Sequence, residues 1–345
     1  MFQLDFTPGR SSLINNREML FFSGYAYLGM NHEPQFLQHF QKGIEMYGAV
    51  FPSSRISNTQ LNLYSETEKI LTDLTQTADT VLLQSGFTAG KASVESIAEG
   101  SHFFHAPFCH PAIRINKNSS LSFADWANKT VQTINANSYN NPPVILSDSL
   151  NQLTAEVYDF SFLNKIEQNI ICIIDDSHGM GLLGINGEGI SSRLPKKENI
   201  EYIITYSLSK AMNIQAGAVS CSNKNRADKI RMGNWYAATT PPSPALLYAF
   251  CESQEIYRQQ RTFLNRNTKF VEGLFLNQKD IHFHNELPVF IFSEKYDEDF
   301  FAKKDIIISS FAYPDPTGKK INRAVVTALH TKDDLQKLAA AANVY

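Results

Sequence analysis

The chain has 345 residues, which is more than a single hydrophobic core usually holds, so its length predicts one large domain and a smaller one. Hydrophobic residues make up 43% of the chain and charged residues 19%, as is typical of a soluble globular protein. The formal net charge of −3 gives no electrostatic reason to expect nucleic acid or an anionic membrane as a partner.

The N-terminus and the cysteines favour a protein of the cytoplasm. Residues 1–12 lack the basic and then apolar layout of a signal peptide, and no apolar run approaches the roughly 18 residues that a transmembrane helix needs. The 4 cysteines show neither CxxC spacing nor a disulfide framework, which suits a reducing compartment. We therefore expect a cytoplasmic localisation.

The first two thirds of the chain predict a large domain. Residues 1–30 are expected to form an N-terminal segment that packs on the body or on a partner subunit. Amphipathic patterns then predict helices at 34–47 and 61–76. Strands and helices alternate after them, over the ranges 80–84, 87–98, 119–123, 124–134, 144–147 and 160–169. This alternation predicts an α/β domain, residues 31–240, whose mainly parallel sheet is covered by helices.

The junction at residues 84–90, QSGFTAG, puts a glycine at the start of a predicted helix. The first backbone N–H groups of a helix point outward, and the helix dipole favours an anion at this end. A plain strand-to-helix turn needs the same glycine. The spacing alone therefore leaves an anion site and a simple turn equally open.

Three histidines follow in residues 101–113, SHFFHAPFCHPAI. Their spacing fits no common zinc pattern, and no acidic ligand accompanies them, so we expect no metal site. Cys109 and His110 are not expected to form a nucleophile pair, because adjacent residues of a strand point to opposite faces. From the residues alone, His110 is either a core histidine or a site residue.

The most informative stretch is at residues 170–217. An apolar, β-branched run ends in Asp175, which predicts a buried parallel strand with a carboxylate at its carboxyl end, where open α/β sheets bind ligands. A second apolar run, 200–206, predicts a neighbouring strand that delivers Lys210 to the same edge. Pyridoxal phosphate needs such a pair, a lysine that holds it and an acid that keeps its pyridine nitrogen protonated. The alternative is a loop-capping aspartate and a surface lysine.

Prolines within residues 241–244 mark a boundary, and residues 241–345 are expected to form a small α+β domain. A long helix is predicted at 244–276. Short strands that look antiparallel are predicted at 289–292, 306–309 and 324–328.

Two runs, DDSHGMG at 175–181 and SLSKA at 207–211, closely resemble signatures of the α-oxoamine synthases. These are fold-type I pyridoxal phosphate enzymes, with the fold of aspartate aminotransferase, that join an amino acid to an acyl-CoA with loss of carbon dioxide. The resemblance covers roughly residues 25–331, including GYAYLGM at 24–30. It implies pyridoxal 5'-phosphate as cofactor, amino acid and acyl-CoA substrates, and a homodimer with shared active sites. An aminotransferase of the same fold type and a cofactor-binding protein without turnover remain alternatives.

The resemblance also implies roles for matching residues. Lys210 would hold the cofactor and act as general base, Asp175 would pair with the pyridine nitrogen, and His110 would stack on the ring. Further cofactor contacts are expected from His178 at the ring oxygen, from Gly86, Phe87, Ser207 and Ser209 at the phosphate, and from Thr239 or Thr240 at the phosphate of the neighbouring subunit. Arg323 is expected to bind the amino-acid carboxylate, and Arg55 lies in a loop expected at the mouth of the site.

Two segments depart from the family pattern. In residues 147–153, Ser147 falls at the family's glutamate and Asn151 at its serine, where a cofactor contact is expected. The family's second arginine corresponds to Ala312 or Tyr313, so its interaction is expected to be absent.

Overall fold

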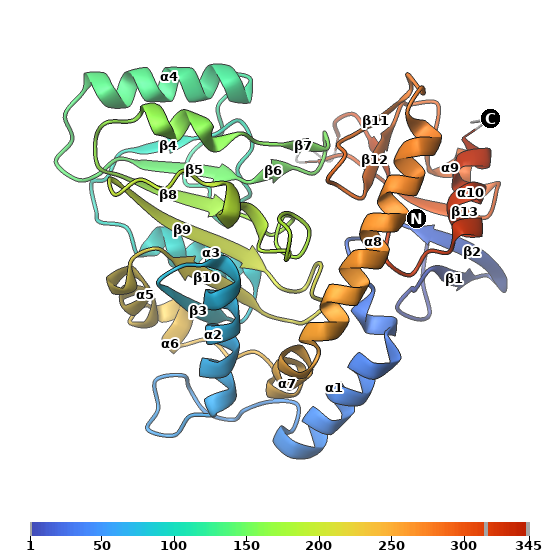
Figure 1. Cartoon of the computed structure of the whole chain (residues 1–345), viewed down its shortest axis with the longest axis horizontal. Helices are drawn as coiled ribbons and strands as arrows, with labels where there is room; N and C mark the ends of the chain where they lie inside the picture. Colours follow the sequence, from blue (N-terminus) through green and yellow to red (C-terminus); the bar gives the residue numbers. More distant parts are fainter. Residues whose placement is uncertain (1, 314–316, 343–345) are drawn as a thin grey trace.

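The computed structural model describes residues 2–313 and 317–342. Two six-stranded sheets lie side by side, with helices packed on both (Figure 1). The strands of the large sheet, in spatial order, are β3 (Asp79–Leu83), β10 (Gly217–Cys221), β9 (Ile200–Ser207), β8 (Ile170–Asp175), β5 (Val144–Asp148) and β4 (Phe103–His105). The last four run parallel to one another, and β10 is antiparallel to both neighbours. The predicted α/β fold with a mainly parallel sheet is thus confirmed.

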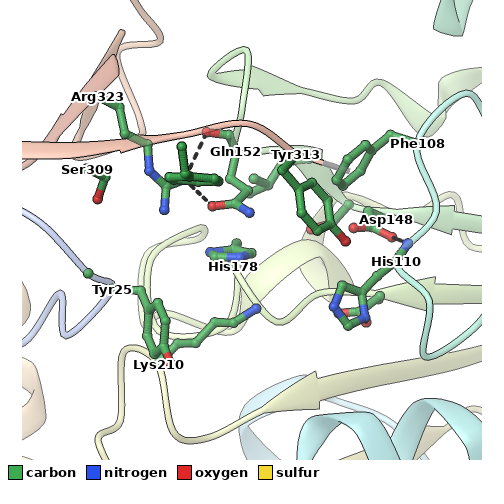
Figure 2. Close-up of a pocket in the computed structure, with 15 residues that line it drawn as sticks. Tyr25, Phe108, His110, Asp148, Gln152, His178, Lys210, Ser309, Tyr313 and Arg323 are labelled. Carbon is green, nitrogen blue, oxygen red and sulfur yellow. Dashed lines mark hydrogen bonds and ion pairs between the residues drawn. The ribbon is translucent and has the colours of Figure 1, made fainter. Parts of the chain in front are cut away.

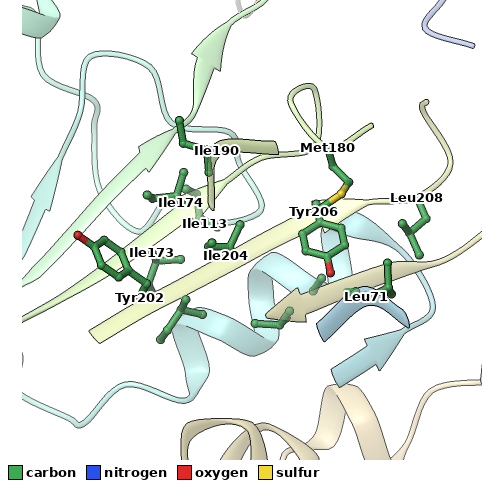
Figure 3. Packing of buried hydrophobic residues seen from close by; sticks show 14 of the residues in the cluster. Leu71, Ile113, Ile173, Ile174, Met180, Ile190, Tyr202, Ile204, Tyr206 and Leu208 are labelled. Atoms are coloured by element: carbon green, nitrogen blue, oxygen red, sulfur yellow. The ribbon is translucent and has the colours of Figure 1, made fainter. Parts of the chain in front are cut away.

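Strands β8 and β9 form the centre of the large sheet. Every residue of β8 is buried, as expected for a strand covered on both faces. Ile173 and Ile204 of these strands belong to one apolar cluster with Leu71 of α2 (Asn62–Thr75) and Met180 of the loop after β8 (Figure 3). This packing fixes where the two strands end.

The strand register aligns polar residues at one edge of this sheet. Asp148 at the end of β5 pairs with Asp175 at the end of β8, and Asp175 pairs with Thr205 of β9. Ser207 ends β9 just beyond Thr205. The carboxyl ends of three adjacent strands therefore present polar side chains to the same edge, where α/β sheets bind ligands.

The helices that pack beside the large sheet are α1 (Pro34–Tyr47), α2, α3 (Gly86–Glu95), α4 (Phe123–Ala136), α5 (Lys224–Arg231), α6 (Asn234–Ala237) and α7 (Pro244–Glu252). Most of these helices lie where the sequence predicts them. Helix α1 packs against α7. Within residues 2–313 and 317–342, no helix is long and apolar enough to cross a membrane.

The strand predicted at 119–123 is wrong. Ser122 instead caps α4, its hydroxyl accepting the backbone N–H of Asp125 at 3.2 Å. The edge position of the sheet belongs to β4, which pairs with β5 in parallel.

Two helix predictions are also wrong in part. Only Phe160–Lys165 of the helix predicted at 160–169 is helical, and it forms a 3-10 helix. The long helix predicted at 244–276 is interrupted at Ser253, between α7 and α8 (Gln254–Phe275). Ser253 is fully buried and its hydroxyl bonds with Nδ1 of His39 at 2.9 Å, which holds the chain at the break.

The small sheet joins both ends of the chain. Its strands, in spatial order, are β1 (Ser11–Ile14), β2 (Arg17–Phe22), β13 (Ile306–Phe311), β14 (Ile321–Val325), β12 (Val289–Phe292) and β11 (Ile281–Phe283). The three strands predicted from the sequence, β12, β13 and β14, pair antiparallel as expected. The N-terminal strand β2, drawn in blue in Figure 1, runs parallel to β13.

The division between the two hydrophobic cores lies within α8. Tyr257 and Leu264 belong to the core of the large sheet, whereas Val271 and Phe275 belong to that of the small sheet. Phe22 of β2 joins the second core. The domain limits that the sequence suggested, at residues 31 and 241, stay a prediction. From the two cores we propose that the small domain begins within α8 and also includes the N-terminal strands.

His330 connects the N-terminal strands to the rest of the small domain. Its ring stacks on Phe22, with ring centroids 4.0 Å apart. Its Nδ1 accepts the N–H of Thr327 at 2.9 Å, so Nε2 carries the proton and donates to the carbonyl of Phe21 at 3.2 Å. Burial lowers the pKa of His330 to about 4, so the neutral ring is the form that the fold accommodates.

This arrangement predicts a loss of stability in acid. Because the folded pKa lies below the usual value, His330 stabilises the fold above about pH 6.5 and loses this contribution as the pH falls towards 4. The free energy of unfolding is obtained from urea titrations at pH 7 and pH 4. We expect its decrease between these two pH values to be larger in the wild type than in His330→Gln, by on the order of 3 kcal/mol. Equal pH profiles would contradict this role.

Candidate active site

A cavity of about 400 Å³ opens at the carboxyl edge of the large sheet, facing the small sheet (Figure 2). Five of the residues predicted for the site line it: His110, Asp175, His178, Lys210 and Arg323. Asp175 ends β8, the other three residues of the large sheet follow strands β4, β8 and β9, and Arg323 comes from β14. The fold therefore brings together side chains that are more than 200 residues apart in sequence.

The loop after β9 holds Lys210 in the cavity. Leu208 donates its N–H to the carbonyl of Ala216 at 2.9 Å, which closes the loop. The hydroxyl of Tyr257 on α8 donates to the carbonyl of Met212 at 2.8 Å, which also holds this loop in place. Burial lowers the pKa of Lys210, although Asp175 opposes the shift. A larger share of this amine is therefore neutral than in a surface lysine.

Asp175 and His110 lie next to each other in the lining of the cavity. Asp175 is only 5% exposed, and its Oδ1 accepts the N–H of Ser177 at 3.0 Å. Its Oδ2 lies 3.8 Å from Nδ1 of His110. That ring nitrogen accepts the N–H of Ala112 at 3.2 Å, and burial lowers the pKa of His110, so the ring is neutral. Asp148 fixes the ring's position, because its Oδ1 accepts the backbone N–H of His110 at 2.8 Å.

The other two histidines of this region lie elsewhere. Nε2 of His105 accepts the N–H groups of Ile115 and Asn116 at 3.3 and 3.2 Å, and the ring of His102 packs against Phe104. Among the residues that the structure describes, no group of three His, Cys, Asp or Glu side chains could hold a metal ion.

His178 is oriented by a tyrosine of the segment 24–30. Nδ1 of His178 lies 2.9 Å from the hydroxyl of Tyr27. Burial lowers the pKa of His178 well below its usual value and raises the pKa of Tyr27 to about 12. Tyr27 is therefore the donor and neutral His178 the acceptor, which leaves the Nε2–H of His178 as the donor for a ligand.

The start of α3 lies against the end of β9. A Cβ at Gly86 would come within 2.6 Å of the Cβ of Ser207, so this close approach requires glycine. The amides of Gly86 and Phe87 are the first two of the helix and have no acceptor within it. The hydroxyls of Ser207 and Ser209 lie 2.7 Å apart beside them. These amides and hydroxyls suit a phosphate group.

Replacement of Gly86 by alanine tests this cluster. The added Cβ must push the start of α3 away from Ser207, so we expect pyridoxal phosphate to bind at least about tenfold more weakly. The dissociation constant is measured by absorbance titration. Gly273→Ala is the matched control, because a Cβ at this helical glycine meets no atom within 4 Å. Equal affinities in the two variants would contradict the expected phosphate site.

Arg323 supplies a positive charge on the side of the cavity that faces the small sheet. It is 4% exposed, and its guanidinium carbon lies 5.2 Å from the centre of the Phe311 ring. Its Nη1 donates to the side-chain and backbone oxygens of Gln152 (Figure 2).

The aminotransferase class I and II family matches residues 22–341 of the chain. The protein belongs to this family. It is 24% identical over 355 residues to 8-amino-7-oxononanoate synthase 1 of Bacillus subtilis (strain 168), covering 97% of this chain and 90% of that protein. It is also 24% identical to 8-amino-7-oxononanoate synthase of Coprothermobacter proteolyticus, covering 94% of this chain and 87% of that protein.

Solved structures of the same family share the architecture. Serine palmitoyltransferase of Sphingomonas wittichii superposes with a TM-score of 0.82 at 13% identity, covering 99% of this chain and 90% of that chain. 8-Amino-7-oxononanoate synthase of Francisella tularensis gives 0.72 at 20% identity, covering 94% and 98%. A serine palmitoyltransferase solved with pyridoxal phosphate gives 0.84 at 15% identity, covering 99% and 91%. The predicted fold type and the resemblance to the α-oxoamine synthases are thereby confirmed.

Several residues that the sequence suggested for the site do not line the cavity. Among them are the residues of the cluster at the start of α3, Gly86, Phe87, Ser207 and Ser209. Nη2 of Arg55 donates to Oε1 of Glu68 at 3.0 Å. The guanidinium carbon of Arg55 lies 4.3 Å from the centre of the Tyr64 ring and 4.9 Å from the centre of the Tyr236 ring. The Oδ1 of Asn151 accepts the N–H of Leu153 at 3.0 Å, so this side chain caps a turn.

Thr239 and Thr240 also lie away from the cavity. The hydroxyl of Thr239 donates to the carbonyl of Trp235 at 2.6 Å, and Thr240 is exposed. Both line a small crevice together with Arg55. Their expected contact is with a second subunit and stays a prediction.

Several residues that line the cavity were not assigned to the site by the sequence analysis, among them Asp148, Gln152 and Tyr313. Asp148 directly follows the strand predicted at 144–147 and ends β5, so the strand-end argument that found Asp175 could have found it. Burial and the neighbouring Asp175 raise the pKa of Asp148 well above its usual value. Tyr313 is one of the two positions, with Ala312, that correspond to the family's second arginine. Gln152 lies next to Asn151 in the segment that departs from the family pattern. No local pattern marked either of these two as a site residue.

Proposed function

We propose that this protein is a pyridoxal phosphate-dependent acyltransferase that condenses an amino acid with an acyl-CoA and releases carbon dioxide, giving an aminoketone. The observation that carries the proposal is the meeting of Lys210, Asp175 and His110 in one cavity, opposite Arg323. The lysine and the carboxylate are the two groups that the cofactor requires, and the arginine suits a carboxylate ligand.

The residues of the cavity fit the cofactor. When bound, pyridoxal phosphate supplies an electron sink for a carbanion at the amino acid's Cα. Lys210 would hold it, the Asp175 carboxylate would keep its pyridine nitrogen protonated, and the neutral ring of His110 would stack on it. The Nε2–H of His178 would donate to the ring oxygen, and the cluster of amides and hydroxyls around Gly86 would bind the phosphate.

Each polar residue has a task with the substrate. Arg323 binds the amino-acid carboxylate and so orients the Cα–H bond towards Lys210. Lys210, with its lowered pKa, accepts the Cα proton as general base. Neutral His110 and His178 keep the geometry fixed and present donors rather than competing cations.

The relatives' names suggest a specific reaction. We propose L-alanine and pimeloyl-CoA as the substrates and 8-amino-7-oxononanoate as the product, which would place the protein in biotin biosynthesis. The supporting observation is the similarity to several proteins of this name over more than nine tenths of the chain. We further propose a cytoplasmic homodimer in which Thr239 or Thr240 contacts the phosphate bound by the neighbouring subunit.

One assay tests this function against its rivals. Purified protein loaded with pyridoxal phosphate is incubated with L-alanine and pimeloyl-CoA, and free thiol and keto product are followed. Thiol release that requires both substrates supports the synthase. Transfer of the amino group to a keto acid without thiol release would instead show an aminotransferase. The absence of both, with glycine and serine and with shorter and longer acyl-CoA also inactive, would favour a binding protein without turnover.

A further inference from the structure

Gln152 occupies the position next to the cationic end of the cavity. It lies in the turn of a hairpin formed by β6 (Leu150–Asn151) and β7 (Glu156–Val157). Its side-chain Oε1 accepts a hydrogen bond from Nη1 of Arg323, and its backbone carbonyl lies 3.4 Å from the same nitrogen (Figure 2). A neutral amide oxygen therefore lies where a carboxylate oxygen of a ligand would bind Arg323.

The backbone around Gln152 is held in place. Asn151 caps the turn through the N–H of Leu153, and the N–H of Thr154 donates to the carbonyl of Asn151 at 3.3 Å. Ala155 has a φ of 51°, a conformation that a non-glycine residue adopts only when its surroundings enforce it. It is 1% exposed and packs in a small apolar cluster with Leu287. The backbone of the hairpin is thus anchored beside Gln152.

Arg323 is anchored as well. It lies within β14, where its backbone pairs with Ile291 of β12 and Ser309 of β13, and its side chain is packed on Phe311. Among residues 2–313 and 317–342 its buried Nε has no hydrogen-bond partner, and no carboxylate forms an ion pair with it. A buried guanidinium with an unfilled donor and only neutral acceptors can still bind a charged acceptor.

We propose that Gln152 is a displaceable plug of the carboxylate site, a neutral side chain that covers Arg323 in the free enzyme and rotates away when a carboxylate ligand binds. The identity of this ligand as the amino-acid substrate rests on the proposed function, whereas the proposed movement of Gln152 does not depend on that function. Hydrogen bonds to a charged acceptor are about twice as strong as neutral ones, so a carboxylate displaces the amide. A neutral ligand such as an amino-acid amide gains no such advantage, and Gln152 thereby selects for a carboxylate.

Binding measurements on two variants test the sign of this effect. In the cofactor-loaded protein, L-alanine is titrated and the cofactor absorbance is followed. Gln152→Ala removes the competitor, and we expect L-alanine to bind about 3- to 10-fold more tightly. Gln152→Glu adds a charged competitor, and we expect binding at least about 10-fold weaker. Glu156→Gln, an exposed change on the same hairpin, should leave the affinity unchanged. If the wild type binds L-alanine, unchanged or weaker binding in Gln152→Ala would overturn the plug.

A second measurement does not depend on the reaction. Phenylglyoxal modifies accessible arginines, and mass spectrometry gives the rate at each position. We expect Arg323 to react several times faster in Gln152→Ala than in the wild type, while the exposed Arg258 reacts equally in both. Equal rates at Arg323 overturn the plug. Faster modification supports it even if L-alanine binds to no variant, a result that would count against the proposed function alone.

Discussion

Replacement of Lys210 by alanine is expected to lower thiol release from acyl-CoA by on the order of 10³-fold or more. The methyl group can neither hold the cofactor nor accept the Cα proton, and no other lysine lines the cavity within residues 2–313 and 317–342. We expect the variant to fold normally, because the loop is closed by backbone bonds of Leu208 and Ala216 and by Tyr257.

The matched control for this variant is Lys197→Ala. The Lys197 amine donates to the carbonyl of Asn164 at 3.0 Å and lies away from the cavity, so we expect thiol release to stay at the wild-type rate. Turnover by Lys210→Ala within a factor of about ten of the wild type would remove the base from the proposed reaction.

Replacement of Asp175 by asparagine is expected to lower turnover by about 10²- to 10³-fold while the fold is kept. The amide has nearly the same shape, and its oxygen can still accept the N–H of Ser177. It carries no negative charge, so the pyridine nitrogen opposite it would no longer be held protonated, and carbanion formation at Cα would become unfavourable.

Two measurements are needed for the Asp175 variant. Steady-state thiol release gives the loss of turnover, and dialysis followed by absorbance gives the retained cofactor. The exposed change Asp73→Asn serves as the control for loss of a carboxylate. Full activity in Asp175→Asn, or an equal loss in Asp73→Asn, would mean that the charge at position 175 has no catalytic role.

Local sequence patterns were enough to predict that Asp175 and Lys210 meet at one edge of the sheet. An apolar, β-branched run before Asp175 specifies a buried strand, and the edge rule for parallel sheets then places its last residue in the ligand site. The same reasoning brought Lys210 to this edge. The two positions could be predicted because strand identity depends mainly on neighbouring residues, and β8 and β9 pair in parallel as the sequence suggested. The roles of the two side chains stay predictions.

Contacts between distant segments could not be predicted in this way. Gln152 meets Arg323 across 171 residues only because the hairpin is anchored by packing on Leu287. The burial of Arg55 by Glu68 depends on how α2 lies over β3, which no local pattern encodes. Ser122 shows the opposite problem, because the alternation of polar and apolar residues in 119–123, SSLSF, resembles a strand, whereas the hydroxyl of Ser122 caps the start of a helix.

The most direct test asks which lysine carries the cofactor. Protein loaded with pyridoxal phosphate is reduced with borohydride, digested and mapped by mass spectrometry. The proposed site predicts a stable phosphopyridoxyl group on Lys210. In the Asp175→Asn, Lys210→Ala double variant we expect no phosphopyridoxyl group on the peptide that contains position 210. A label on a different lysine, with Lys210 unmodified, would contradict the central assignment of this cavity as the place where the chemistry occurs.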